Sequence, residues 1–299
     1  MELKQKNTRF RAYQLGNEGS SFSYFDGTYF TLIEARLNET NTPSLVQEIE
    51  KCNVKNNIDT LHITSWDEDH CKKGELEIIL RVLKPKRIEY PGYLPHTDNG
   101  TECFKMIKAY TGNIVAITQN YVSHLTSAQS WGYSNILYNN QKDYPESNNN
   151  SSIKLFRAGC FSVLSLGDVE SKEIANFLIK HTSILNEVDV MILAHHGADN
   201  GFTTDEFIKK VNPSVAVCSS NYDNQYDHNP RQEIKDILYN NEVKLYTTKT
   251  GDVVIRSNGD HTISYEAINL ISNSTKVSSE SGTLSTKRHN HFIEQILDF

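Results

Sequence analysis

Apolar and polar positions alternate in the first part of the chain. Three alternating stretches occupy residues 10–15, 20–25 and 28–33, and two glycine-containing breaks separate them. The second break is Asp26-Gly27, a dipeptide that favours tight hairpin turns. We therefore expect residues 9–36 to form a set of antiparallel strands.

Beyond this region, short apolar runs alternate with segments of helical period. We expect helices at 43–56, 74–83, 100–110, 171–180, 204–211 and 231–240. We expect strands at 58–63, 87–90, 113–118, 152–157, 160–166, 188–194, 214–219 and 243–247, and a closing hairpin at 252–265. Alternation of helices and strands in both halves predicts a layered α/β or α+β fold with a central pocket.

Three regions lack a regular period. Residues 119–148 separate two core elements and are interpreted as a specificity insert, and the Asn-rich stretch 139–150 as a loop. Residues 272–287 are rich in Ser and Thr and read as a linker. The last residues, 291–299, fit either an amphipathic turn or a frayed tail. We predict a main domain at 1–268 and a linker with a tail at 269–299.

Composition narrows the class of protein. The 299 residues are 37% hydrophobic and 22% charged, as in ordinary soluble domains, and the formal net charge is −7. This charge does not attract nucleic acid, so any such contact depends on a local patch or on metal ions. The five cysteines form no CxxC pair, which argues against a disulfide framework or a Cys-rich zinc finger. The polar N-terminus and the absence of a long apolar run predict a cytoplasmic protein that does not contact a membrane.

The sequence TSWDEDH at residues 64–70 follows an expected strand. It places the carboxylates of Asp67 and Asp69 beside the imidazole of His70. Oxygen and imidazole ligands together suit Zn²⁺, Mn²⁺ or Fe²⁺. Taken alone, the segment also fits a solvated acidic turn.

Other polar groups also stand at strand ends. These are Asn149 and Ser152, Asp168, the pair His195 and His196, and His228. Each has a plain structural interpretation, such as a helix cap for Asp168 or a hydrogen bond within a loop for His228. Their recurrence in the same position, in order along the chain, predicts instead a metal centre at one edge of a sheet sandwich.

The order and spacing of these segments resemble the metallo-β-lactamase fold, an αββα sandwich. The resemblance is nearest to the soluble hydrolase domain of ComEC-type DNA-uptake proteins, and it runs from about residue 9 to 266. The matching segments are residues 14–19, 34–36, 64–70, 149–152, 166–168, 194–198, 226–230 and 248–252. The chain departs from the pattern at Ser65, where the family usually has a histidine, at 34–36, and around Ser20.

The resemblance implies a divalent metal, Zn²⁺ or Mn²⁺, as one or two ions. The implied ligands are Asp67, Asp69, His70, Asp168 and, ahead of its neighbour, His195. The implied catalytic residues are Asp67, Asp69, His196 and His228. The implied substrate-binding residues are Asn149, Ser152 and His228.

Three functions follow from this resemblance. The first is a metal-dependent phosphodiesterase or nuclease acting on nucleic acid or nucleotides. By analogy with stand-alone copies, it would be an effector in an anti-phage defence system, beside a protein partner such as an ATPase or sensor. The second is a hydrolase of small lactones, esters or amides. The third is a degenerate, non-catalytic binding module, which Ser65 in place of histidine would suit.

Overall fold

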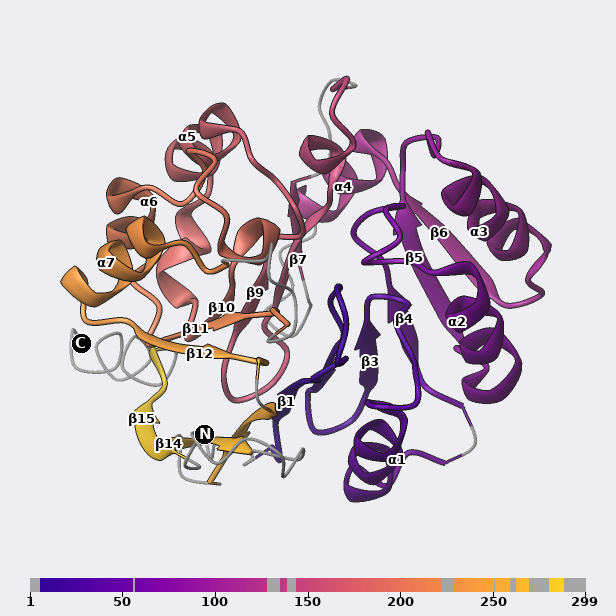
Figure 1. Ribbon diagram of the computed structural model, residues 1–299, viewed down its shortest axis with the longest axis horizontal. Helices are drawn as coiled ribbons and strands as arrows, with labels where there is room; N and C mark the ends of the chain where they lie inside the picture. Colours follow the sequence, from indigo (N-terminus) through magenta and orange to yellow (C-terminus); the bar gives the residue numbers. More distant parts are fainter. Residues whose placement is uncertain are drawn as a thin grey trace.

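Two β-sheets face each other in the computed structural model, and helices cover the outer face of each (Figure 1). The structure describes residues 6–55, 57–127, 135–138, 144–221, 229–249, 251–258, 262–268 and 280–287. Helices α1, α2 and α3 lie outside the first sheet, and α5, α6 and α7 lie outside the second. The predicted αββα sandwich is therefore confirmed.

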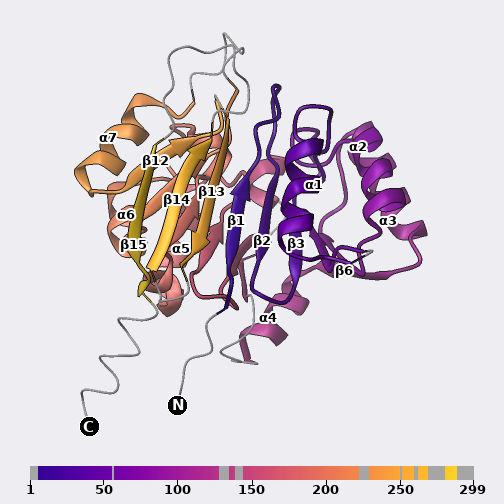
Figure 2. The same ribbon diagram turned by 90° about the horizontal axis from the view of Figure 1, so that it is seen from below.

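The first sheet has nine strands among the described residues, in the order β15-β14-β13-β1-β2-β3-β4-β5-β6. Their bounds are β1 Arg9–Ala12, β2 Phe22–Phe25, β3 Phe30–Ile33, β4 Thr60–His62, β5 Arg87–Pro91, β6 Asn113–Ile117, β13 Asp252–Ser257, β14 Thr262–Ile268 and β15 Ser281–Ser285. Pairing is antiparallel from β15 to β3 and parallel from β3 to β6. The closing strands therefore lie beside the opening ones (Figure 2).

The second sheet has the order β12-β11-β10-β9-β8-β7 in the described part of the chain. Its strands are β7 Asn135–Tyr138, β8 Ile153–Phe156, β9 Val163–Ser165, β10 Val190–Ile192, β11 Val215–Cys218 and β12 Lys244–Thr247. The strands from β9 to β12 are parallel, so their carboxyl ends meet at one edge. Loops at such an edge are where ligands bind in open α/β sheets.

Side-chain hydroxyl groups begin several of the helices. Thr97, Ser171 and Thr204 each accept a hydrogen bond from a backbone N–H in the first turn of α3, α5 and α6. The helices are α1 Thr42–Lys51, α2 Lys73–Ile78, α3 Asp98–Ala109, α4 Gln119–Ser127, α5 Lys172–His181, α6 Asp205–Val211 and α7 Gln232–Asn240. A π-helical turn, η1 Ile79–Leu83, continues α2.

Three apolar layers hold the sandwich together. One lies between the sheets and includes Phe10, Phe22, Phe156 and Val217. A second packs α1 to α3 on the first sheet, and a third packs α5 to α7 on the second. Strands such as β10 and β11 are buried on both faces, which explains their continuous apolar runs.

The six predicted helices and the closing hairpin are confirmed, with shifts of a few residues at their ends. The region 119–148 contains α4 and β7, which the sequence pattern did not predict. The prediction of a linker at 272–287 is wrong in part, because residues 281–285 form β15 and pair with β14. The tail at 291–299 lies outside the described residues. None of the described helices is long and apolar enough to cross a membrane.

Candidate metal centre

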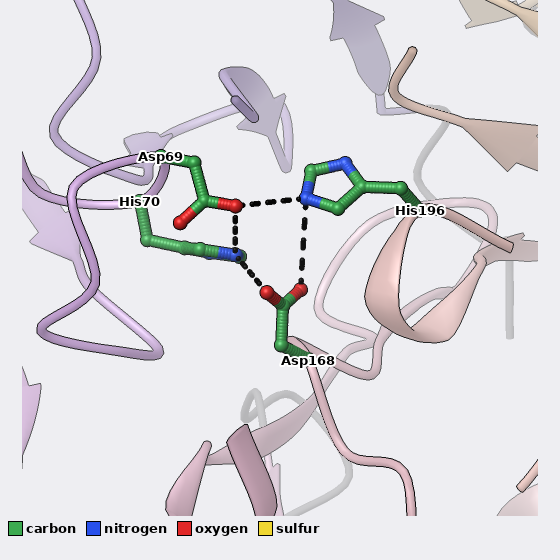
Figure 3. A group of neighbouring side chains, drawn as sticks. All are labelled: Asp69, His70, Asp168 and His196. Carbon is green, nitrogen blue, oxygen red and sulfur yellow. Dashed lines mark hydrogen bonds and ion pairs between the residues drawn. The ribbon is translucent and has the colours of Figure 1, made fainter. Parts of the chain in front are cut away.

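Four side chains from the two halves of the chain converge at one edge of the sandwich (Figure 3). They are Asp69, His70, Asp168 and His196, and each offers one ligand atom within 4.8 Å of the other three. His70 Nε2 lies 2.8 Å from Asp168 Oδ2, and His196 Nε2 lies 3.1 Å from Asp69 Oδ2. Bonds of about 2.0–2.2 Å to a shared ion would place ligand atoms about 3–4 Å apart, so these spacings fit an ion.

The turn after β4 delivers the first two groups. The backbone N–H of His70 and of Cys71 both donate to Asp67 O, at 2.9 and 2.8 Å, which closes a tight turn. Ala35 N–H then donates to His70 O at 2.7 Å and ties the turn to the end of β3. Asp69 and His70 are thus placed at the carboxyl ends of two neighbouring strands.

Asp168 follows β9 through a left-handed glycine. Gly167 has φ +56°, and a Cβ there would lie 2.8 Å from Ser151 Cβ. The hydroxyl of Ser151 accepts the backbone N–H of Asp168 at 3.2 Å. The close approach needs glycine, and it sets Asp168 beneath His70 with only 3% of its surface exposed.

His196 follows β10 on an unusual turn. His195, His196 and Gly197 all have positive φ, at 45°, 53° and 75°. Non-glycine residues in this region carry a cost of about 1–3 kcal/mol each and collect at functional sites. The turn directs His196 into the cluster. Gly197 packs closely against Pro230, and a Cβ added to Gly197 would lie only 2.7 Å from Pro230 Cβ.

Both histidines are oriented through Nδ1. His196 Nδ1 lies 3.0 Å from Ser219 O, to which it donates when protonated there. His70 Nδ1 lies 3.2 Å from Glu34 Oε1 and 3.3 Å from Thr64 Oγ1. A carboxylate or carbonyl at this nitrogen is the usual support of a metal-binding histidine, because it leaves Nε2 free for the ion.

Similarity to known proteins agrees with this geometry. The chain is 29% identical over 202 residues to ComE operon protein 3 of Bacillus subtilis, which covers 67% of the chain and 24% of that protein. It is 30% identical over 103 residues to Competence protein ComA of Neisseria gonorrhoeae, covering 34% of the chain and 14% of that protein. The chain therefore spans a quarter or less of the length of either relative. No protein-family model matches it.

Solved structures decide the fold. YhfI of Bacillus subtilis, described as a metallo-β-lactamase fold protein, superposes with a TM-score of 0.51 at 12% identity, covering 84% of the chain and 100% of YhfI. The chain has a metallo-β-lactamase fold. Igni18 of Ignicoccus hospitalis, described as a novel metallo hydrolase, gives a TM-score of 0.47 at 14% identity, covering 83% of the chain and 98% of Igni18. The predicted resemblance is confirmed for the fold, and the similarity to ComE operon protein 3 supports its ComEC-type branch.

In this metallo-β-lactamase fold, the charges of the four clustered side chains balance one another. Burial alone would lower the pKa of His196, but Asp168 and Asp69 raise it to about 9. Burial likewise opposes protonation of His70, yet Asp168, Asp69 and Glu34 hold its pKa well above the usual range. Burial would raise the pKa of both aspartates, whereas His70 and His196 lower it. Two carboxylates and two imidazoles thus neutralise one another, and a divalent ion can replace the two protons.

One atom bears directly on whether an ion fits. His70 Nε2 is buried and lies 2.8 Å from Asp168 Oδ2 and 3.8 Å from Asp69 Oδ2. This nitrogen faces the centre of the cluster, where it can hold either a proton or a divalent ion between the carboxylates (Figure 3). The donor set of two imidazoles and two carboxylates suits Zn²⁺ or Mn²⁺.

The two neighbouring histidines differ from the order expected. The structure brings His196, and not His195, into the cluster. His195 Nδ1 lies 2.7 Å from Glu170 Oε1 at the partly exposed rim. The geometry therefore favours His196 as the ligand from this turn, because consecutive residues of a left-handed turn point in different directions.

The remaining predicted site residues lie around the cluster. Asp67 is bonded to serine hydroxyls. Asn149 Oδ1 accepts the backbone N–H groups of Glu170 and Ser171, so it shapes the loop after Asp168. Ser152 is 1% exposed. His228 lies outside the described residues, and its predicted roles stay predictions.

Sequence reasoning missed the groups that support the ligands. Glu34 was noted only as a departure from the family pattern, and Ser219 was not singled out. The signal for Glu34 was its place at the end of a predicted strand, like the other site groups. Ser219 acts through its backbone oxygen, which carries no side-chain signal in a sequence.

Proposed function

We propose that the chain is a metal-dependent hydrolase whose ion is held by Asp69, His70, Asp168 and His196. The observation that carries this proposal is the convergence of four ligand atoms around the buried Nε2 of His70, which lies 2.8 Å from Asp168 Oδ2. Zn²⁺ and Mn²⁺ are the ions to which this donor set is best suited.

A bound divalent ion would supply Lewis acidity and lower the pKa of water at the site. The chain's own groups do the rest. Glu34 and Ser219 O fix the rings of His70 and His196, so that Nε2 of each faces the cluster. The His196 side chain is 13% exposed and that of Asp69 31%, so this side of the cluster is open to a substrate.

For the substrate we propose a phosphodiester in nucleic acid or nucleotides. The similarity to ComE operon protein 3 and Competence protein ComA supports a link to competence proteins. The acidic chain would rely on the ion, rather than on its overall field, to attract phosphate. A protein partner such as an ATPase or sensor, in an anti-phage defence role, would extend this proposal, and co-purification with the neighbouring gene product tests it.

The direct test compares wild type with Asp168→Asn, and uses Glu68→Gln as the matched control. Glu68 lies on the same turn as Asp69, but its side chain is 61% exposed and pairs with the side chain of Lys72. Metal content and cleavage of plasmid, oligonucleotide and bis(p-nitrophenyl) phosphate are measured with added Zn²⁺ or Mn²⁺. We expect metal and cleavage in wild type and Glu68→Gln, and loss of both in Asp168→Asn.

Two other outcomes of this experiment would identify the alternative functions. Bound metal with intact nucleic acid, together with turnover of lactones, esters or amides, identifies a small-molecule hydrolase. Wild-type protein that binds no metal, with Asp168→Asn unchanged in every assay, identifies a non-catalytic binding module. Either result contradicts the proposed phosphodiesterase.

A further inference from the structure

The two aspartates of the turn after β4 have different surroundings. Asp69 faces the cluster with His70 and His196. Asp67, two residues earlier, instead accepts two hydroxyl hydrogen bonds on one oxygen. Ser65 Oγ donates to Asp67 Oδ2 at 2.9 Å, and Ser147 Oγ donates to the same atom at 2.8 Å.

The first of these serines is held firmly. Ser65 is fully buried, and its hydroxyl lies 3.1 Å from the phenol oxygen of Tyr93. The backbone N–H of Asp67 donates to Ser65 Oγ at 3.2 Å, and that of Trp66 donates to the Tyr93 phenol at 3.2 Å. The Asp67 carboxylate is therefore fixed by a small network from its own turn and from the loop after β5.

The second serine comes from the other half of the sandwich. Ser147 begins the 3₁₀ turn η2, Ser147–Asn150, which precedes β8. That turn is anchored by Asn148, which donates to Glu170, and by Asn149, which accepts two backbone N–H groups. The hydroxyl that reaches Asp67 is thus part of a fixed structure that bridges both sheets.

This arrangement conflicts with a second ion at Asp67. Oδ2 already takes two hydroxyl protons, so an ion at Asp67 would have to bind through Oδ1 and find its other ligands nearby. The nearby hydroxyls of Ser65, Ser147 and Tyr93 are neutral, and neutral hydroxyls are weak ligands for Zn²⁺. Among the described residues, the His, Cys, Asp and Glu side chains form no second group of three that could hold an ion.

We propose that the centre holds a single ion and that Asp67 stays outside its coordination shell, fixed by Ser65 and Ser147. This inference rests on the proposed metal centre. It assigns different roles to the two aspartates: Asp69 is a ligand, and Asp67 is a positioning residue of the turn. Its other oxygen, Oδ1, accepts no hydrogen bond from a described residue and is free to accept one from water or substrate.

The test uses the matched variants Asp67→Asn and Asp69→Asn. Each protein is stripped with a chelator, and its binding of Zn²⁺ and of Mn²⁺ is measured by calorimetry and by metal analysis after dialysis. We expect one equivalent in wild type and in Asp67→Asn, with affinities within about threefold, and binding weakened roughly tenfold or more in Asp69→Asn. Circular dichroism confirms that each variant is folded.

Two equivalents in wild type would overturn the inference, whether or not Asp67→Asn loses one of them. Should Asp67→Asn fail to fold, the wild-type stoichiometry alone decides, because one ion supports the inference and two contradict it. No ion in wild type would instead refute the proposed metal centre itself. The two failures are therefore distinguishable.

Discussion

His196 Nε2 lies 3.1 Å from Asp69 Oδ2, and this contact joins two turns that are 127 residues apart in the chain. The turn of Asp69 follows β4 of the first sheet, and the turn of His196 follows β10 of the second. The centre therefore forms only when both halves of the sandwich are folded against each other. An ion held there would link the two sheets and stabilise the native state by binding it alone.

The pair His195 and His196 offers a matched test of which ring binds. His196→Ala removes a ring from the cluster, and we expect its affinity for Zn²⁺ to fall roughly tenfold or more. His195→Ala removes a ring that pairs with Glu170 at the rim, and we expect a change of less than about threefold. Competition with a chromophoric chelator measures both. Equal losses, or a larger loss in His195→Ala, would contradict the assignment.

Stability of the metal-free protein should depend on pH through His196. Its folded pKa of about 9 lies above the ordinary value of 6.5. The stabilisation from its protonated ring is therefore fully present below pH 6.5, and it is lost as the pH rises through about 9. The pKa of Asp168 is lowered instead, so the stabilisation from its charged carboxylate is lost as the pH falls below about 4.

We therefore expect the free energy of unfolding, measured in urea with a chelator present, to fall between pH 7 and 10. In His196→Asn this alkaline decrease should be smaller. A decrease of the same size in the variant would show that another group causes it.

Glu34 should tune the metal through His70. In Glu34→Gln the negative charge near His70 Nδ1 is lost, and an amide NH₂ could face the Thr64 N–H that now donates to Glu34 Oε2 at 3.0 Å. We expect Zn²⁺ affinity to fall about 10–100-fold and stability to fall by about 1–3 kcal/mol. The control is Glu68→Gln on the exposed side of the turn. Unchanged affinity in Glu34→Gln would remove Glu34 from the support of the ion.

The loop before β2 should be sensitive at Gly19. This residue has φ +126°, and an added Cβ would lie 2.5 Å from Asp69 O and closer still to the Arg36 guanidinium. We expect Gly19→Ala to lower the melting temperature and to weaken Zn²⁺ binding by displacing the turn of Asp69. Gly74→Ala is the control, because a Cβ there meets nothing within 4 Å and alanine favours the helix. Equal behaviour of the two variants would contradict a tight contact at Gly19.

Much of this centre could be predicted because its groups stand at strand ends. Asp69, His70 and Asp168 each follow a short apolar run, and parallel strands bring such ends together. The choice between His195 and His196 could not be predicted, because it depends on the left-handed backbone of the turn. The hydroxyl of Ser147 reaches Asp67 across 80 positions of sequence, and no local pattern signals that contact.

The secondary structure, like the metal centre, can be predicted from the sequence only in part. Buried strands such as β10 and β11 have continuous apolar runs, so the sequence predicts their positions well. Strand β15 lies at the edge of its sheet and alternates between exposed and partly buried residues, so its Ser- and Thr-rich sequence predicts a linker instead of a strand. Edge strands need few apolar residues, and their pairing depends on the partner strand.

The position of the ion among the four side chains can be located directly. Crystals grown with Zn²⁺ and measured above and below the zinc absorption edge would locate it by anomalous scattering. We predict a single strong peak at about 2.0–2.2 Å from Nε2 of His70 and His196 and from carboxylate oxygens of Asp69 and Asp168. A peak bound by His195 or Asp67 instead, or no peak among these four side chains, would contradict the account.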